Sequence, residues 1–211
     1  MAIGDAYATV QDYRALTGKS STDQDLQLQG DLLAVSRLLD RLTGHVETGF
    51  NKDEAAVKRI FLPDPYAPDA ALLFVPPLAA APVSVKIDTD GDGLFTDETA
   101  LAATDYQRLP LNAAAGPIAR PWTALRLTRW AATYASWPQH LHVEVDAVWG
   151  WPAVPDMVRR ATVELVAILR IESPRATSQV NELQNVLEVS SAGQRVVRDL
   201  VATLRPAAAM I

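Results

Sequence analysis

The stretch that decides the fold is VEVDAVWGWPAVPDMVRR, residues 143–160. In its first half, apolar residues alternate with acidic ones, which is typical of a strand with one buried face. Gly150 ends this strand, and Pro155 lies where the first turn of a helix tolerates a proline. Apolar residues then recur at helical spacing, which predicts a helix over Pro155–Glu172. A strand that faces a core therefore runs almost directly into an amphipathic helix.

Two helices are predicted upstream of this junction. Thr9–Gly18 is predicted as a short helix that Thr9 caps and Gly18 ends. Thr22–Gly49 is predicted as a long helix, with Thr22 and Asp25 in a pattern like a capping box. Its narrow apolar stripe packs either against its own domain or, as a coiled-coil seam, against helices of other subunits. The stripe comprises Leu28, Leu32, Val35, Leu39, Leu42 and Val46.

Between Lys58 and Trp149 the pattern changes to short apolar runs separated by prolines. Runs of this length and spacing are typical of an antiparallel sheet or a small barrel. The predicted strands are Arg59–Leu62, Ala71–Val75, Val83–Ile87, Leu125–Trp130 and Leu141–Trp149. After the helix that follows the junction, a weaker helix over Thr177–Glu188 and a short amphipathic helix over Gln194–Leu204 are predicted.

This order of elements predicts an α+β fold, in which a helical core contains an antiparallel β-rich insertion. The expected helical core comprises residues 1–55 and 151–190. The expected insertion comprises residues 56–150, and residues 191–211 form a C-terminal segment.

The composition excludes several classes of protein. The net charge is −6 and the isoelectric point is about 5.0, which argues against nucleic-acid binding as the main task. The chain has no cysteine, which excludes disulfides and cysteine chemistry and fits a cytoplasmic protein. No apolar run is long enough to predict a membrane span, and the first residues lack the features of a signal peptide.

The segment DTDGDGLFTDET, residues 88–99, has the spacing of a calcium-binding loop. Its aspartates fall at positions 1, 3 and 5, and a glycine falls at position 6. Thr99 stands where a glutamate is expected, Glu98 is one place off, and a predicted strand precedes the loop, so it is not an EF-hand. It is either a plain Asp- and Gly-rich turn or a turn that binds Ca²⁺ as a structural ion. If it binds Ca²⁺, the expected ligands are Asp88, Asp90, Asp92 and Asp97; no cofactor is required.

Aromatic residues and histidines leave the function open. The five tryptophans indicate the core of a small sheet, a subunit interface or a ligand platform. His45, His140 and His142 are interpreted as ordinary residues, because no third metal ligand accompanies the last two. No nucleophile or phosphate-binding motif is present, so the chain is predicted not to be an enzyme. The tryptophans are Trp122, Trp130, Trp137, Trp149 and Trp151.

A second stretch, AVSRLLDRLTGHVETGF over residues 34–50, resembles one family when it is taken with the junction. Small head–tail connector (adaptor) proteins of long-tailed phages, prophages and gene transfer agents carry the pattern A-S-x-x-I-D-x-x-T-G-x-x-F near the end of a long helix. Here one extra residue precedes Ser36, and the gap before Phe50 is longer. Further similar features follow in the family's order, so the resemblance covers about residues 8–172. The matching positions are Ala34, Ser36, Leu39, Asp40, Thr43, Gly44, Phe50, Pro82–Ile87, Asp105, Tyr106, Gly116, Ile118, Trp122, Trp149, Gly150, Pro152 and Pro155.

The resemblance implies a structural role in the virion. Connectors of this family form a ring, commonly of twelve subunits, beneath the portal protein. The ring extends the DNA channel and offers a platform for the stopper (tail-completion) protein and the tail. DNA passes without specific binding, no membrane is involved, and the subunits occupy the host cytoplasm before assembly.

The resemblance also implies that the C-terminal segment docks on the portal, with packing on its own helical core as the alternative. The candidate docking residues are Arg195, Val197, Leu200, Val201, Leu204 and Ile211.

Two other classes of function stay open. A calcium-dependent binding module would be a monomer that Ca²⁺ stabilises. An uncharacterised hydrolase would lose activity on carboxylate substitution, since acid/base sites need no motif.

Overall fold

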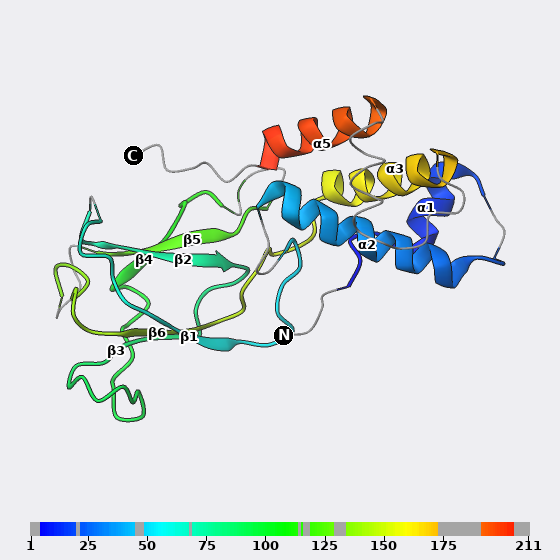
Figure 1. Cartoon of the computed structure of the whole chain (residues 1–211). Helices are drawn as coiled ribbons and strands as arrows, with labels where there is room; N and C mark the ends of the chain where they lie inside the picture. Colours follow the sequence, from blue (N-terminus) through cyan, green and yellow to red (C-terminus); the bar gives the residue numbers. More distant parts are fainter. Residues whose placement is uncertain are drawn as a thin grey trace. The chain divides into compact units, whose positions relative to one another are not determined.

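The computed structural model of the chain describes residues 5–19, 22–44, 49–67, 69–113, 115, 119–128, 134–172 and 191–204. Two helices come first, six strands follow, and helices close the chain (Figure 1). The elements are α1 (Val10–Thr17), α2 (Asp25–Thr43), β1 (Val57–Phe61), β2 (Leu72–Leu78), β3 (Ser84–Ile87), β4 (Tyr106–Leu109), β5 (Trp122–Leu127), β6 (Val143–Ala147), α3 (Asp156–Glu172) and α5 (Ser191–Leu204).

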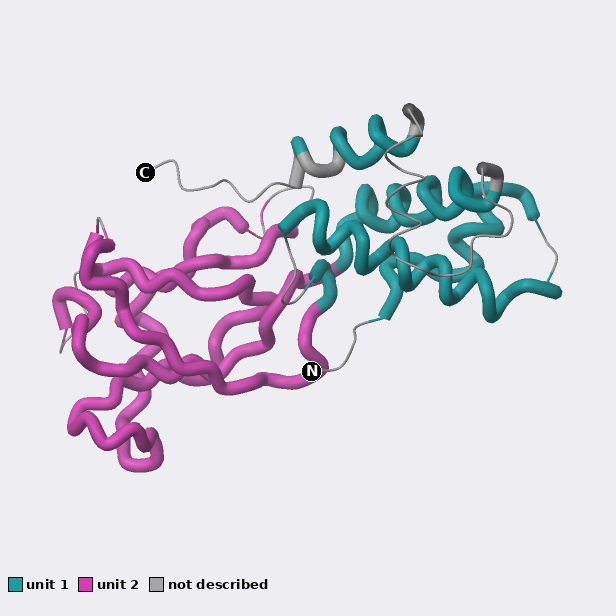
Figure 2. The backbone as a smooth tube through the Cα atoms, viewed as in Figure 1, with its two compact units in different colours: residues 1–51, 154–210 teal, residues 52–153, 211 magenta. Residues whose placement is uncertain are grey.

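The backbone divides into a helical unit and a β-rich unit, which Figure 2 colours separately. The helical unit comprises Met1–Asn51 and Val154–Met210, and the β-rich unit comprises Lys52–Ala153. The chain therefore leaves the helical unit once and returns to it once. The fold is α+β, as the order of helical and strand patterns predicts.

Helix α1 has the ends that the sequence predicts. The Thr9 hydroxyl accepts the Asp12 N–H at 3.2 Å, and the Asp12 carboxylate accepts the Thr9 N–H at 2.7 Å, which completes a capping box. The bond from the Thr9 N–H holds the pKa of Asp12 below its ordinary value. Gly18 ends the helix with φ of 69°, a left-handed conformation that favours glycine.

Helix α2 is shorter than predicted at both ends. It begins at Asp25, and no side chain caps its first turn, because the Asp25 N–H donates to the backbone carbonyl of Thr22 instead. The capping box predicted for Thr22 is therefore wrong. The helix ends at Thr43, and Gly44 follows with φ of 79°. Residues 45–48, which include His45 and Val46, lie outside the described residues.

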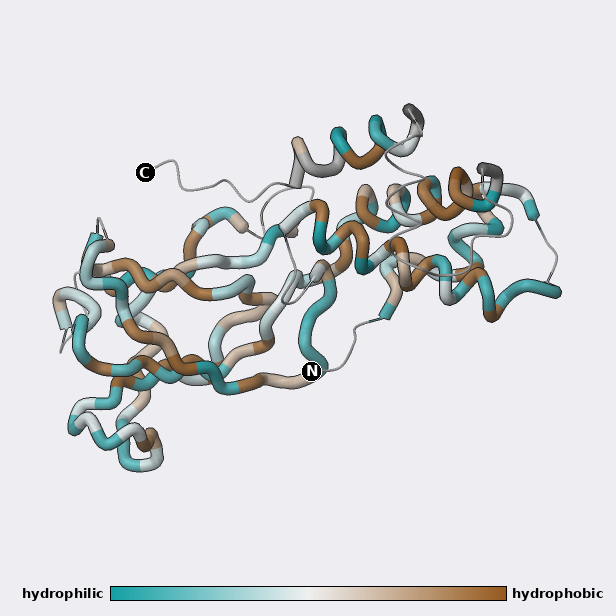
Figure 3. The backbone as a smooth tube through the Cα atoms, viewed as in Figure 1, coloured by the Kyte–Doolittle hydropathy of each residue, from teal (hydrophilic) through white to brown (hydrophobic). Residues whose placement is uncertain are grey.

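The buried face of α2 is wider than the predicted stripe. Leu38 is 1% exposed although it lies outside the stripe, and Leu42, within it, is 37% exposed. Helix α2 contacts α1, α3 and α5. Because these helices pack on it from several sides, its buried face is wider than one narrow stripe. Figure 3 shows the hydrophobic segments of α2 and α3 in brown. The buried residues of α2 are Leu28, Asp31, Leu32, Val35, Ser36, Leu38, Leu39, Asp40 and Thr43.

A buried polar network, the clasp, holds the N-terminal segment against α2. It consists of Tyr7, Ser36, Arg37, Asp40 and Phe50. The Tyr7 hydroxyl donates to the Asp40 carboxylate and accepts the Phe50 N–H at 2.8 Å. The Tyr7 N–H donates to Ser36 Oγ at 3.0 Å, and Arg37 Nη1 donates to Asp40 Oδ2 at 2.7 Å.

The clasp leaves no room for a side chain at residue 49. Gly49 has φ of 59°, and a Cβ there would overlap the Tyr7 hydroxyl and lie 2.9 Å from Asp40 Oδ1. The rings of Tyr7 and Phe50 meet edge to face with centroids 5.6 Å apart, and Phe50 is fully buried. The clasp thus uses Ser36, Asp40 and Phe50, three positions of the pattern that resembles the connector family.

The β-rich unit contains two antiparallel three-stranded sheets that face each other (Figure 1). One sheet has the order β1-β6-β3, and the other has the order β2-β5-β4. Alternate residues of both sheets point inward and form one core, as period-two patterns require. The core residues are Leu73, Val75, Leu78, Val85, Ile87, Leu125, Leu127, Trp137, Val143, Val145, Ala147 and Trp149.

Trp149, at the end of the opening stretch, connects the two sheets. Its indole N–H donates to the Val57 carbonyl of β1 at 2.6 Å, and its backbone pairs with Leu78 of β2. The Phe61 ring lies 5.7 Å from it, and the Arg59 guanidinium lies 4.7 Å over its ring. Trp149 is completely buried, which confirms the core interpretation for this tryptophan.

The strand predictions are right in order, but their bounds differ: β5 begins at Trp122, three residues before the predicted start, and β1 begins at Val57, two residues before it. Three further differences are larger. Strand β4 was not predicted, because YQRL has no apolar alternation. Strand β2 continues through Pro76 and Pro77 to Leu78, where a break in register accommodates the prolines. Strand β6 begins at Val143, so His140 and His142 precede the strand instead of sharing one of its faces. Trp130 and the predicted helix over Thr177–Glu188 lie outside the described residues.

Replacing the Tyr7 hydroxyl tests the clasp. In Tyr7→Phe, the buried Asp40 carboxylate and the Phe50 N–H each lose a partner, so we expect the free energy of unfolding to fall by about 1–3 kcal/mol. Urea denaturation measures the loss. The matched control is Tyr66→Phe, since Tyr66 is 91% exposed and its substitution should change stability by less than about 0.5 kcal/mol. Equal effects of the two substitutions would contradict the clasp.

The clasp also predicts a pH dependence. Burial, and next the hydrogen bond to Asp40, raise the pKa of Tyr7 above its ordinary value. The folded chain keeps Tyr7 neutral where the unfolded chain ionises it, so this stabilisation is complete below about pH 10 and is lost as the pH rises further. The stability difference between the wild type and Tyr7→Phe should therefore narrow above about pH 10. Urea denaturation of both proteins at these pH values measures the difference. A stability difference that does not change with pH would contradict a raised pKa of Tyr7 in the folded chain.

Candidate functional site

The turn over residues 88–99, here called the acidic turn, follows β3 directly. Asp88 is 1% exposed, and its carboxylate accepts the N–H groups of Gly91 at 2.9 Å and Gly93 at 3.1 Å. Both glycines have positive φ, of 76° and 78°. The Lys86 ammonium donates to the Phe95 carbonyl at 2.5 Å, and the Phe95 side chain is buried. Asp88 therefore shapes the turn from inside, and Phe95 anchors it.

The structure brings together two of the four predicted metal ligands. Carboxylate oxygens of Asp88, Asp90 and Glu98 lie within 4.8 Å of one another. Asp92 and Asp97 are outside this group; the Asp92 carboxylate accepts the Leu94 N–H at 2.6 Å instead. Glu98 was not among the predicted ligands. Its place in the sequence, one residue before the position where a calcium loop has its glutamate, was the signal that could have identified it. Binding of Ca²⁺ by this turn stays a prediction.

The histidines add little to the turn. His142 Nδ1 lies 3.8 Å from Asp88 Oδ2, and the His142 side chain is 53% exposed. His140 is also exposed. Both histidine side chains are thus exposed, and the long distance makes the contact of His142 with the buried Asp88 a weak one, so their interpretation as surface residues is retained.

The C-terminal helix α5 contacts α3 and α2. Of the predicted docking residues, Arg195 is exposed and Val197 is half-buried. The side chains of Leu200, Val201 and Leu204, and the whole of Ile211, lie outside the described part of the chain. A shallow groove of about 340 Å³ lies between α3 and α5. It is lined by Met157, Arg160, Ala161, Glu164, Arg195, Val196 and Asp199.

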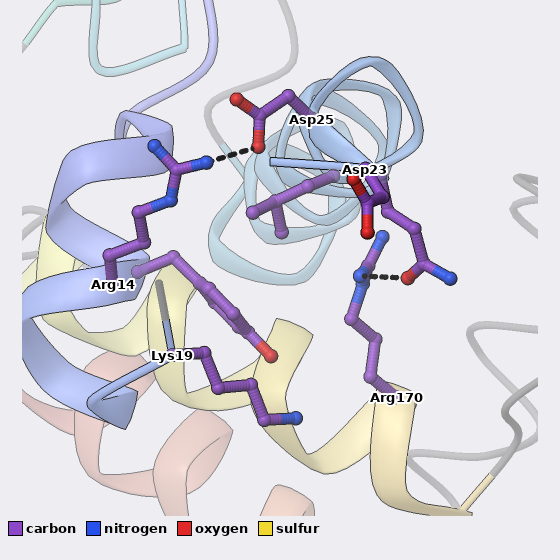
Figure 4. A pocket seen from close by; sticks show the side chains of 8 residues that line it. Arg14, Lys19, Asp23, Asp25 and Arg170 are labelled. Carbon is purple, nitrogen blue, oxygen red and sulfur yellow. Dashed lines mark hydrogen bonds and ion pairs between the residues drawn. The ribbon is translucent and has the colours of Figure 1, made fainter. Parts of the chain in front are cut away.

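A smaller pocket of about 170 Å³ lies among α1, α2 and α3 (Figure 4). Two arginines that line it form ion pairs between helices: Arg14 with Asp25, also in the lining, at 2.5 Å, and Arg170 with the buried Asp31, behind the lining, at 2.9 Å. Arg170 also donates to Gln24 at 3.1 Å. These contacts connect α1 with α2 and α2 with α3, and removing Arg170 would leave the Asp31 carboxylate buried without its ion pair.

Among the described helices, none has both the length and the hydropathy needed to cross a lipid bilayer. Of the five tryptophans, Trp137, Trp149 and Trp151 are at most 4% exposed, and Trp122 is half-buried beside Arg108, whose guanidinium lies 4.4 Å over its ring. The described tryptophans thus do not form an open platform for a ligand.

Comparison with solved structures shows a likeness over the whole chain. No sequence-family profile and no curated protein matches the chain. A solved structure described as the neck of an empty GTA particle, computed with C6 symmetry, is similar over 100% of this chain and 95% of its own, with a TM-score of 0.54 and 18% sequence identity. The chain therefore shares the fold of a component of a GTA (gene transfer agent) particle neck.

Substitution of Asp88 tests the role of its carboxylate in the acidic turn. Asp88→Ala removes the acceptor of two backbone N–H groups, so we expect a loss of about 1.5–3 kcal/mol in the free energy of unfolding without added metal. Asp97→Ala is the matched control, because Asp97 is an exposed acid of the same turn. Thermal or urea denaturation measures both. A loss in Asp97→Ala as large as in Asp88→Ala would show that Asp88 has no special role.

Calcium decides between the two interpretations of the acidic turn. A ligand that binds only the folded chain raises its melting temperature. If the turn binds Ca²⁺, the ion should stabilise the wild type but not Asp90→Ala, which removes the ligand oxygen. An unchanged melting temperature at millimolar Ca²⁺ would identify a plain turn.

Proposed function

We propose that the chain is a structural connector in the neck of a phage or phage-like particle and is not an enzyme. The observation that carries this proposal is the likeness to a GTA particle neck over the full length of this chain and nearly all of the other. The likeness covers both units of the chain. It includes the order in which the β-rich unit interrupts the helical unit. A single shared sheet or helix pair would support much less.

The motif positions support the same proposal independently of the overall fold. Ser36, Asp40 and Phe50 build the clasp, and Trp149 joins the two sheets. These residues therefore hold the fold together and are not exposed for catalysis. A family whose shared residues are structural in this way fits a subunit that works by its shape and its contacts.

In the proposed assembly, copies of the chain form a closed ring beneath the portal protein, with twelve subunits expected from the family resemblance. The ring continues the DNA channel, and its far side receives the stopper and the tail. A cyclic ring uses two different, complementary surfaces on each subunit, so several exposed apolar residues are expected without an active site. The net charge of −6 suits a channel past which DNA slides without specific binding.

We assign attachment to the portal to the C-terminal segment. Helix α5 lies against α3 and α2, so it also contributes to the helical unit. The docking function is therefore assigned chiefly to the residues after Leu204, with Arg195 as an exposed contact on the helix. Any Ca²⁺ bound by the acidic turn would act as a structural ion.

Truncation in the native particle tests this function. Deleting the gene should give DNA-filled heads without tails, and the full chain supplied in trans should restore tailed particles. A chain that ends at Leu204 keeps α5, so it should fold with unchanged thermal stability but fail to restore tails. Electron microscopy counts tailed and tailless particles, and circular dichroism checks the fold.

Two outcomes would count against the proposal. Tailed particles at normal yield without the chain would refute the connector function. Full restoration by the truncated chain would refute the docking assignment and leave the connector function standing.

A further inference from the structure

The acidic turn contains both Asp–Gly pairs of the sequence, Asp90-Gly91 and Asp92-Gly93, and the sequence has no Asn–Gly pair. Asp–Gly pairs cyclise readily in flexible chains, because glycine has no side chain to shield its backbone nitrogen and adopts many backbone conformations. All four residues are exposed, so water reaches them. By sequence and exposure alone, the backbone of this turn is a place for spontaneous chemical modification.

This modification is an intramolecular acyl transfer that needs no enzyme. The glycine nitrogen attacks the side-chain carboxyl carbon of the preceding aspartate, so that a C–N bond forms and a C–O bond breaks. The hydroxyl of the carboxyl group leaves with the hydrogen of the nitrogen as water, and a succinimide ring remains. Water then adds to one of the two ring carbonyl groups. Opening on one side restores aspartate, and opening on the other gives isoaspartate, whose backbone runs through the side chain and is longer by one methylene.

In the folded turn, one carboxylate holds both attacking nitrogens. The Asp88 oxygens accept the Gly91 N–H at 2.9 Å and the Gly93 N–H at 3.1 Å, and Asp88 is 1% exposed. Such a nitrogen can attack only after its hydrogen bond to the charged group breaks. The buried negative charge also disfavours loss of the hydrogen from the nitrogen. Asp88 therefore opposes the first step at both pairs.

The carboxyl groups that would be attacked are also held away from the glycine nitrogens. The Asp90 carboxylate accepts the Asp92 N–H at 3.2 Å, and the Asp92 carboxylate accepts the Leu94 N–H at 2.6 Å. Each carboxylate thus bonds the N–H two residues further on, as aspartates in turns commonly do, and not the adjacent glycine N–H. The same arrangement occurs at both Asp–Gly pairs.

We propose that Asp90 and Asp92 are latent sites of isoaspartate formation, and that the Asp88 carboxylate keeps them intact by holding both glycine N–H groups. Asp88 is thus a positioning residue that determines how long the backbone of the turn survives. The inference goes beyond the proposed connector function, and it holds whether or not the turn binds Ca²⁺.

Ageing of the full chain tests the proposal. The wild type, Asp88→Ala and Asp97→Ala are incubated in metal-free buffer, at a temperature well below the melting temperature of each. Methylation by protein isoaspartyl methyltransferase counts the isoaspartate, and mass spectrometry of peptides assigns it to Asp90 or Asp92. In Asp88→Ala we expect isoaspartate to form about tenfold faster at both residues, because the bond to a charged group no longer has to break first. Asp97→Ala should age like the wild type, since Asp97 is an exposed acid outside these bonds.

A second control separates the carboxylate from the general rigidity of the turn. The Lys86 ammonium fixes the turn through its bond to the Phe95 carbonyl at 2.5 Å. Lys86→Met removes this bond and leaves the acceptor of the glycine N–H groups in place, so we expect isoaspartate to form at a rate close to that of the wild type. Equal acceleration in Lys86→Met and Asp88→Ala would overturn the proposal, because rigidity alone would then protect the turn.

The fold of each variant is checked by circular dichroism before and after ageing. A folded Asp88→Ala chain that forms isoaspartate no faster than the wild type would also overturn the proposal. If Asp88→Ala does not fold, Asp88→Asn takes its place, since it keeps the shape of the side chain and loses only the charge and one acceptor oxygen. We then expect faster isoaspartate formation at Asp90, Asp92 or both, and a wild-type rate at both would overturn the proposal.

Discussion

The hydroxyl of Tyr7, buried between the Asp40 carboxylate and the Phe50 N–H, is the interaction on which the helical unit depends. It joins the N-terminal segment, α2 and the chain just before it enters the β-rich unit. A buried carboxylate needs partners, and here Tyr7 and Arg37 supply them. The same crowding requires glycine at residue 49. The point at which the chain leaves the helical unit is therefore fixed by a few polar contacts at close quarters.

Trp149 has the corresponding role in the β-rich unit. The Trp149 side chain donates a hydrogen bond to β1 and packs against Phe61, and its backbone pairs with β2. Trp149 therefore contacts both sheets. The chain leaves this unit shortly afterwards and begins α3 at Asp156. Both crossings between the units thus lie beside a buried anchor, Phe50 at the first and Trp149 before the second.

Much of this fold could be predicted from the sequence where the signal is local. Thr9 and Gly18 define α1, and the alternation from Val143 to Trp149 identifies the buried face of β6, because capping and period two depend on neighbouring residues. Contacts between distant residues could not be predicted. The partner of Tyr7 is 33 residues away, β4 has no apolar alternation, and Glu98 joins Asp88 only because the turn folds back on itself. Of the four predicted ligands, only Asp88 and Asp90 lie together, so whether the turn binds metal stays a prediction. The clasp was visible in the sequence only as an unexplained pattern.

The central claim is that the chain works as a subunit of a ring in a particle neck. The most direct measurement is the mass of the purified chain by light scattering, with negative-stain microscopy of the same sample, alone and mixed with the portal protein of the same particle. The account predicts closed rings, or a complex with the portal. A monomer that does not bind the portal protein, and whose melting temperature rises with Ca²⁺, would contradict the ring. It would favour a calcium-dependent binding module.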